Sequence, residues 1–188
     1  MLNIASKHLS QQIEIGTTLI DEVNAFVVER LRHYYTGQGY RTELVNAALA
    51  SPWTSLPDLD ARLQSLASFM NEEAAASLAA SNKRIGNILK KSDIDFSTDI
   101  NTEILNLDEE KALFEEVSRI ENLVKPLLAE QQYEKSLLLL SELRSPVDRF
   151  FDEVMVNDKD PVLRANRLAL LAALKGQFDR IADLSILG

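Results

Sequence analysis

The chain of 188 residues contains no cysteine, which excludes disulfide bonds, thiolate zinc sites and cysteine nucleophiles. Glycine and proline are scarce as well, with six and five residues, and this scarcity favours long helices over a β architecture rich in turns. The longest apolar run, at residues 168–174, is far shorter than the ~20 residues of a membrane span. The first ten residues offer no apolar stretch suited to a signal peptide. These absences predict a soluble, cytoplasmic protein.

Motifs for catalysis and metal binding are missing too. His8 and His33 are the only histidines, and neither stands at a spacing suited to metal ligation. No glycine-rich phosphate-binding motif is present, and neighbouring acids such as Glu72 and Glu73 would diverge on a helix instead of converging on one pocket. We therefore expect no catalytic residue, no metal site and no cofactor in this chain.

What the sequence does contain is the spacing of amphipathic helices. From Leu19 to Tyr34, apolar residues recur at steps of three and four, which predicts a helix that ends at Gly37 and Gly39. Residues 92–107 are polar and weakly periodic, which predicts a loop with one helical turn. Further helices are predicted over residues 42–50, 56–70, 72–80, 83–91, 108–131, 133–144, 146–156 and 161–184. No segment has a convincing strand pattern, so the predicted fold class is all-α, a bundle of seven to nine helices.

Several predicted helix boundaries depend on single residues. Ser81 and Asn82 predict a break between an alanine-rich helix and the basic helix that follows it. Asp108 can cap the next long helix, which Pro126 can kink or divide. Pro146 suits the first position of a helix, where its missing N–H costs nothing.

Charge is unevenly distributed along the chain. The formal net charge is -9, and residues 93–121 hold most of the acidic excess. Residues 81–92, by contrast, contain four Lys or Arg and no acid. A pI of about 4.8 argues against a general nucleic-acid-binding protein. It does not argue against one local basic surface, because charges are screened beyond about 8 Å at physiological salt.

A first ladder of cations repeats every seven residues. On a helix, Arg84 and Lys91 superpose within roughly 20°, and Lys83 and Lys90 repeat the same interval beside them. The apolar residues between them would face the core and leave the cations on the solvent side. Such a ladder is either a solvated face, which can pair with the acidic segment after it, or a surface that contacts phosphates.

A second ladder lies in the last predicted helix. Arg164 and Lys175 are eleven residues apart and again lie within roughly 20° of each other, with Arg167 about 60° away. Periodicity leaves the same two alternatives open for this ladder.

Aromatic residues also allow two interpretations. Tyr34, Tyr35, Trp53, Phe150 and Phe151 could serve as platforms on which nucleobases stack. The core is the stronger interpretation, because Phe26, Tyr34 and either Phe150 or Phe151 fit apolar helix faces and Trp53 lies between prolines, where it can fill a helix junction.

Four segments, taken together and in this order, resemble one family. They are FVVERLRHYYTGQGYR (26–41), AAASLAASNKRIGNIL (74–89), ELRSPVDRFFDEVMVNDKD (142–160) and LRANRLALLAALKGQFDRIADLSIL (163–187). They resemble the C-terminal region of bacterial glycyl-tRNA synthetase β subunits, and the succession of VDxFFDxVMV and NRLxLL is the most specific part. That region in turn resembles the all-helical anticodon-binding domain of arginyl-tRNA synthetases, called the DALR domain. Those four letters do not occur here, and the corresponding stretch reads NRLAL.

The resemblance implies a tRNA-binding, DALR-like domain over residues 17–188, preceded by a lead-in segment, residues 1–16, from a longer polypeptide. Its implied partners are glycine tRNA, the remainder of the β subunit and the α subunit of a heterotetramer, with no DNA and no membrane. Activation of glycine with ATP and Mg would belong to the α subunit, so this fragment alone is expected to be non-catalytic.

The resemblance also gives the basic ladders a purpose. Phosphate contacts would position an anticodon stem-loop, and polar side chains and stacking would read its unstacked bases. The candidate tRNA-binding residues are Lys83, Arg84, Asn87, Lys90, Lys91, Arg164, Arg167 and Lys175. Asn82 and Asn166 are further candidates for hydrogen bonds to bases, the alternative being a helix cap or a surface position. A second function class stays open: a helical protein-interaction module that docks on the rest of the synthetase.

Overall fold

The computed structural model describes residues 19–97 and 99–188, and within them the chain forms eight α-helices and no strand. The helices are α2 (Leu19–Gly37), α3 (Thr42–Leu49), α4 (Leu56–Phe69), α5 (Glu73–Lys90), α6 (Asp108–Ala129), α7 (Tyr133–Ser141), α8 (Arg144–Glu153) and α9 (Pro161–Asp179). Two 3-10 turns, η1 (Thr102–Ile104) and η2 (Leu184–Ile186), complete the order. The all-α prediction is confirmed, as is the single turn within 92–107. The predicted lead-in segment lies outside the described residues.

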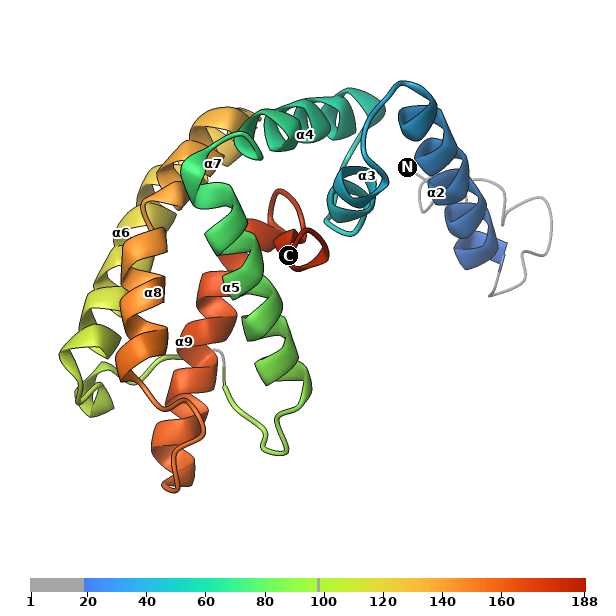
Figure 1. The fold of residues 1–188 in the computed structure, drawn as a ribbon. Coiled ribbons are helices and arrows are strands. Elements are labelled where there is room, and N and C mark those ends of the chain that lie inside the picture. The colour runs from blue at the N-terminus through green and yellow to red at the C-terminus, as the bar shows by residue number, and fades with distance from the viewer. Residues whose placement is uncertain (1–18, 98) are drawn as a thin grey trace.

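The helices form an arch that has a bundle at one end (Figure 1). In the bundle, α6 and α9 pack together, α8 packs against α5 and α6, and α5 also packs against α9. α7 connects α6 with α4, and α4 crosses from the bundle toward α3. α2 packs mainly on α3 at the far end of the arch, and the C-terminal turn η2 returns between α5 and α3 (Figure 1). None of the described helices is both long and apolar enough to cross a lipid bilayer.

Among the described helices, α9 has the largest number of buried residues and α2 the smallest. Nine of the 19 residues of α9 are buried, whereas α2 buries only Tyr35. The largest fully buried side chains come from α4 to α9 and the turn between α7 and α8: Phe150, Phe178, Leu59, Leu63, Leu66, Leu78, Ile85, Leu113, Ile120, Leu137, Leu140 and Leu143. Because buried apolar surface is the main stabilising contribution, the bundle around α9 is the stable part of the molecule and α2 is peripheral.

The predicted break at Ser81 and Asn82 is wrong, because α5 runs without interruption from Glu73 to Lys90. Asn82 is buried, and its side-chain amide donates to the carbonyl of Leu78 one turn earlier (3.0 Å). Asn and Ser can satisfy their polar groups on the carbonyls of their own helix, so they do not have to end it. The alanine-rich and basic segments are therefore one straight element.

The start of α6 also differs from the prediction. Asp108 is the first helical residue and not the cap, which is the position of Leu107. The cap is closed by Glu110, whose buried carboxylate accepts the backbone N–H groups of Asn106 and Leu107 (both 2.9 Å). α6 then continues past Pro126 to Ala129, so the proline does not divide it.

Two further helix boundaries differ from the prediction. α8 begins at Arg144, before Pro146, and α9 ends at Asp179 instead of near Leu184. After Asp179 the chain tightens, because the N–H groups of both Ile181 and Ala182 donate to the carbonyl of Phe178 (2.8 and 3.0 Å). This tight turn sends the C-terminal residues back across α5.

Some aromatic residues expected in the core are exposed. Phe26 is 60% exposed and Tyr34 59% exposed, and Tyr35 is the residue of α2 that is buried instead. Phe150 is fully buried and Phe151 is half-buried. The periodicity of α2 correctly predicts a helix. It wrongly predicts that Phe26 and Tyr34 contact the core, because α2 lies beyond the bundle.

A buried polar network fastens α4 to the bundle. The Arg62 guanidinium donates to Asp58 Oδ1 (2.8 Å) and to the carbonyl of Arg180 (2.6 Å), and it lies 4.6 Å from the centroid of the Tyr133 ring. The Tyr133 hydroxyl and the backbone N–H of Thr54 also donate to the Asp58 carboxylate. Burial alone would raise the pKa of Asp58, but these hydrogen bonds outweigh it and hold the pKa at about 2.

Candidate nucleic-acid interface

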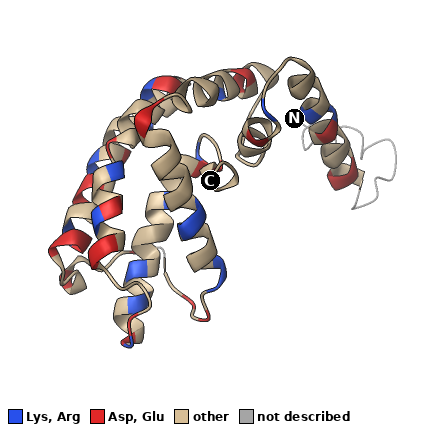
Figure 2. Ribbon diagram, in the orientation of Figure 1, with Lys and Arg blue, Asp and Glu red and all other residues tan. Residues whose placement is uncertain are grey.

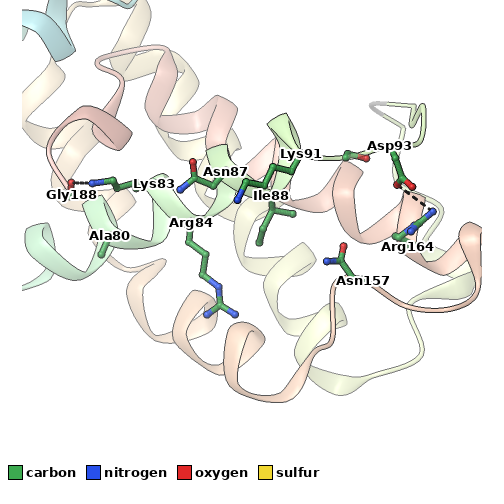
Figure 3. A pocket seen from close by; sticks show the side chains of 11 residues that line it. Ala80, Lys83, Arg84, Asn87, Ile88, Lys91, Asp93, Asn157, Arg164 and Gly188 are labelled. Carbon is green, nitrogen blue, oxygen red and sulfur yellow. Dashed lines mark hydrogen bonds and ion pairs between the residues drawn. The ribbon is translucent and has the colours of Figure 1, made fainter.

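A cavity of about 790 Å³ lies between the second half of α5 and the start of α9 (Figure 3). We call this cavity the basic groove. Its lining residues are Ala80, Lys83, Arg84, Asn87, Ile88, Lys91, Ser92, Asp93, Asn157, Arg164 and Gly188. Four of the seven cations of the two ladders, together with Asn87, thus meet around one hollow of the surface.

The helical repeat of α5 explains why these side chains lie together. Ile85 is fully buried against the core, and this fixes the rotation of the helix. Lys83, Arg84, Asn87 and Lys91 then lie on the exposed side, as the first ladder predicts. The groove is therefore built by an element whose opposite face is part of the core.

Cations outnumber acids in the basic groove. Lys83, Arg84, Lys91 and Arg164 line it, and Asp93 is the one acidic residue among the lining residues. Arg164 Nη2 lies 3.5 Å from Asp93 Oδ1, and Lys83 Nζ donates to the carbonyl of Gly188 (2.5 Å), as Figure 3 shows. The groove therefore keeps an excess of positive charge that can attract an anion.

Lys90 and Lys91 stand at the C-terminal end of α5. Both are exposed, and among the described residues neither forms an ion pair. Cations at this end of a helix are stabilised by the negative end of its dipole. Lys90 is not among the lining residues of the groove and lies at its margin.

Arg84 is held differently from the other cations of the groove. Its guanidinium carbon lies 4.0 Å from the centroid of the Phe151 ring on α8. A second cavity of about 530 Å³ adjoins the basic groove at this point, since both are lined by Arg84, Ile88 and Asn157. We call it the aromatic cavity. Its remaining lining residues are Phe151, Asp152, Glu153, Val154, Met155 and Val156.

Arg167 does not face solvent, contrary to the prediction from the second ladder. It is buried, and its guanidinium donates to Glu110 (2.5 Å), to Asp158 (2.7 Å) and to the carbonyl of Met155 (2.9 Å). Its hydrogen bonds join α9 to the start of α6 and to the turn before α9. The periodicity correctly places Arg167 on a helix, but its side chain lies on the buried face of α9.

Lys175 is likewise engaged within the protein. Its ammonium donates to Asp179 (2.6 Å) and to Asp183 (3.2 Å), and its side chain is only 16% exposed. Burial raises the pKa of the Asp179 carboxyl, although the Lys175 ammonium opposes the rise. Lys175 is not among the lining residues of the groove, so only Arg164 of the second ladder joins the first ladder there.

The three asparagines suggested as base-reading residues have different positions. Asn87 is exposed and lines the groove. Asn82 is buried inside the molecule, and Asn166 uses its amide to bind the backbone of Asn101, accepting from its N–H (2.8 Å) and donating to its carbonyl (3.0 Å). Asn166 therefore fixes the loop before α6, and only Asn87 is placed to meet a ligand.

Acidic residues gather away from the groove (Figure 2). In that view, Asp and Glu are frequent along α6 and α8, whereas the lower halves of α5 and α9 show mainly Lys and Arg. Several acids of α6 are neutralised locally, as Glu116 is by Arg119 (2.6 Å) and Glu121 by Arg180 (2.6 Å). In the described part of the chain, no group of three or more His, Asp or Glu side chains is placed to hold a metal ion.

Sequence reasoning missed two groups at the site, Asp93 and Asn157, and left the role of a third, Phe151, open. Asp93 partly neutralises Arg164, Asn157 lines both cavities, and Phe151 supports Arg84. The one available signal was the aromatic pair at Phe150 and Phe151, which the sequence leaves open between core and stacking. The structure divides the pair, with Phe150 in the core and Phe151 at the surface site.

Comparison with known families agrees with this arrangement. The family model of the DALR anticodon binding domain matches residues 78–188, which include α6 to α9 and most of α5. The chain belongs to this anticodon-binding family, as the resemblance in its sequence predicts.

Curated relatives extend the similarity toward the N-terminus. The glycine–tRNA ligase beta subunit of Escherichia coli O1:K1 / APEC is 43% identical over 172 residues, which cover 92% of this chain and 25% of the relative. That of Enterobacter sp. (strain 638) is 41% identical over 169 residues, 90% of this chain and 24% of the relative. The chain thus spans about a quarter of the length of these curated relatives.

Proposed function

We propose that this chain binds the anticodon arm of glycine tRNA as part of a glycine–tRNA ligase β subunit. The observation that carries the proposal is the basic groove, where Lys83, Arg84, Lys91 and Arg164 converge with a single acid among the lining residues. Membership of the anticodon-binding family and similarity to ligase β subunits support the choice of ligand. Phosphate oxygens of the RNA would replace solvent around these cations, and the released counterions would favour binding.

The rest of the proposed assembly lies outside this chain. Because they are about four times as long as this chain, the remainder of the β subunit is the first proposed partner, and an α subunit in a heterotetramer is the second. We assign glycine activation, with ATP and Mg, to the α subunit, and we expect this domain to act in the cytoplasm by positioning tRNA. The domain would then contribute to binding and orientation and leave the chemistry to other parts of the ligase.

Salt dependence tests RNA binding at the groove. Replacing Lys83, Arg84, Lys90 and Lys91 with Ala should weaken binding of glycine tRNA and flatten the log-log dependence of the binding constant on salt by about two to four units, because each lost phosphate contact removes roughly one. Binding would be measured by filter retention over a series of salt concentrations, with circular dichroism to verify the helices.

A matched control separates local contact from net charge. The set Lys111, Lys125, Lys135 and Arg149, on α6, α7 and α8, has the same charge and is exposed. Changing this control set to Ala should leave the salt slope close to that of the unmodified chain. Equal slopes for the two fourfold variants would show that the groove is not the site of RNA contact.

A second function, docking on protein, is favoured by the surface near α2. A cavity of about 500 Å³ opens between α2 and the turn before α4, and its lining is mostly apolar. Its lining residues are Asn24, Val27, Val28, Ser51, Pro52, Trp53, Thr54 and Leu56. Leu19 and Phe26 on α2 and Leu56 on α4 are also exposed, at 43%, 60% and 48%. Such apolar exposure is typical of an interaction surface.

We infer that the occupant of this surface is the remainder of the β-subunit polypeptide. The similarity to ligase β subunits covers 92% of this chain, whereas the family match starts only at residue 78. The helices α2 to α4 therefore belong to what these relatives share beyond the anticodon-binding domain, and they are the natural place for an internal junction.

Hydrogen exchange can test the junction. Backbone amides of residues 19–34 should exchange quickly in this chain and at least tenfold more slowly in the intact β subunit, because docking would cover α2. A Phe26→Ser change in the intact subunit should restore fast exchange at α2 and leave α9 protected. If protection of α2 instead rises with the concentration of this chain alone, the occupant is a second copy and the inference fails.

A further inference from the structure

Arg84 and Phe151 form a stacked pair, which the buried Phe150 anchors to the core. Phe151 contacts Phe150 edge to face, with ring centroids 5.7 Å apart and planes at 75°, and Phe150 is fully buried. Phe151 in turn supports the Arg84 guanidinium at 4.0 Å. A planar group that is stacked on an anchored ring loses little further freedom when a ligand binds to it.

The hydrogen-bonding groups of Arg84 are not used within the described part of the chain. Among those residues, no carboxylate or carbonyl accepts a hydrogen bond from its side chain, in contrast to Arg62 and Arg167, which each have several acceptors. Arg84 is exposed, and it lines both the basic groove and the aromatic cavity. Its outer face and its N–H groups are therefore accessible at the junction of the two.

The two cavities suit different parts of a nucleotide. At the Lys91 and Arg164 end the lining is cationic, as phosphate requires. At the Arg84 end the aromatic cavity adds Phe151 and Met155, whose side chain is 74% exposed, and the carboxylates of Asp152 and Glu153. Carboxylates repel phosphate but accept hydrogen bonds from exocyclic amino groups of bases. Arg84 and Lys91 are about 10 Å apart along the helix axis, so these ends are distinct sites.

We propose that the aromatic cavity is a nucleobase site, in which one unstacked base of a single-stranded loop stacks on the outer face of Arg84. Phe151 supports the inner face, Met155 provides an apolar side, and Asp152 or Glu153 accepts from an amino group of the base. The site prefers a base with an exocyclic amino group to uracil. This inference rests on the proposed RNA-binding function and adds to it a base-reading position at the junction of the basic groove and the aromatic cavity.

The test compares two hairpin RNAs with the same stem and equal loop lengths. One has the anticodon loop of glycine tRNA and the other has a loop of uridines only. In the intact chain, Arg84→Lys keeps the charge but removes the planar group, so affinity for the anticodon-loop hairpin should fall about 5- to 100-fold while the salt slope stays unchanged. Phe151→Leu should act in the same direction. Arg149→Lys, on the same helix as Phe151, is the matched control and should change neither quantity.

Preference for the amino-bearing loop provides an independent measurement. Changing Asp152 to Asn together with Glu153 to Gln should reduce the ratio of the two affinities toward one. The inference is overturned, and RNA binding stands, if Arg84→Lys binds both hairpins like the unmodified chain or if only Arg84→Ala weakens binding and flattens the salt slope. Failure of the unmodified chain to bind either hairpin would overturn both the inference and the proposed function.

Discussion

At the scale of single residues, the cations of this chain form two groups, those that are paired with carboxylates and those that face the groove. Arg62, Arg167 and Lys175 are held on carboxylates within the protein. Arg84 and Lys91 have no carboxylate partner in the described part of the chain and face the groove. The chemical type of a basic residue is thus a weak guide to its role, because burial and the nearest acid decide whether its charge is available to a ligand.

Arg167 should be a structural residue. Arg167→Ala would leave Glu110 buried without its cationic partner, and loss of one member of a buried ion pair typically costs about 3–5 kcal/mol. Urea unfolding followed by circular dichroism would measure the loss. Arg164→Ala is the comparison, since Arg164 is partly exposed and its ion pair with Asp93 is long, so the cost should be under about 1 kcal/mol. Similar losses for the two variants would contradict the assignment.

At the scale of elements, α5 unites two functions in one helix. Its first half packs Ala75, Leu78 and Ala79 into the core, and its second half presents the cations. Since the helix is continuous through Ser81 and Asn82, the packing of the first half and of Ile85 together fixes the position of the groove. A break at these residues would instead have allowed the basic segment to move independently.

Proline substitutions can test this continuity. Ser81→Pro removes an interior backbone donor and should cost about 3 kcal/mol or more. Glu73→Pro is the matched control, because Glu73 is the first residue of α5 and Glu72 before it is already extended (φ -74°, ψ 145°), as a residue before proline should be. The control should therefore cost little, as measured by thermal unfolding. Equal tolerance of the two prolines would mean that α5 is broken at Ser81 after all.

The sequence predicts the positions of the helices well, but it predicts less well which face of each helix is buried. Periodicity places α2, α3 and α4 correctly because it depends on neighbours three and four residues away. It cannot show that Arg167 faces Glu110, which is 57 residues distant, or that α2 lies beyond the bundle with Phe26 exposed. The first ladder succeeds because Ile85 fixes the buried face of α5 locally, whereas the second ladder depends on partners in other elements.

At the scale of the whole molecule, a polar junction adds to the apolar packing that joins α4 to the bundle. Asp58 and Arg62 on α4, Tyr133 on α7 and the carbonyl of Arg180 after α9 meet in a buried network. Breaking it should weaken the attachment of α4 to the bundle, while the buried leucines of α4 continue to pack there.

The junction predicts a specific dependence on pH. The folded-state pKa of Asp58, about 2, lies below the ordinary value of 3.8, so the unfolded chain takes up this proton first as the pH falls. The contribution, about 2 kcal/mol, should be complete above about pH 5 and lost between about pH 4 and 2. Asp58→Asn should lower stability at pH 7 and remove this part of the acid dependence in urea unfolding. Asp95→Asn, at an exposed position, should preserve it, and an unchanged acid profile in Asp58→Asn would refute the prediction.

The separation of charge seen in Figure 2 has a consequence for the rate of encounter. A polyanion far from the chain meets a net charge of -9, and the groove dominates only within about 8 Å at physiological salt. A free search for RNA by this domain should therefore be slow. A tether to a body that already holds the same RNA replaces that search with an effective concentration, which reaches the millimolar range for short flexible linkers. An acidic domain with a basic groove is thus suited to binding an RNA that another part of a larger protein has already captured.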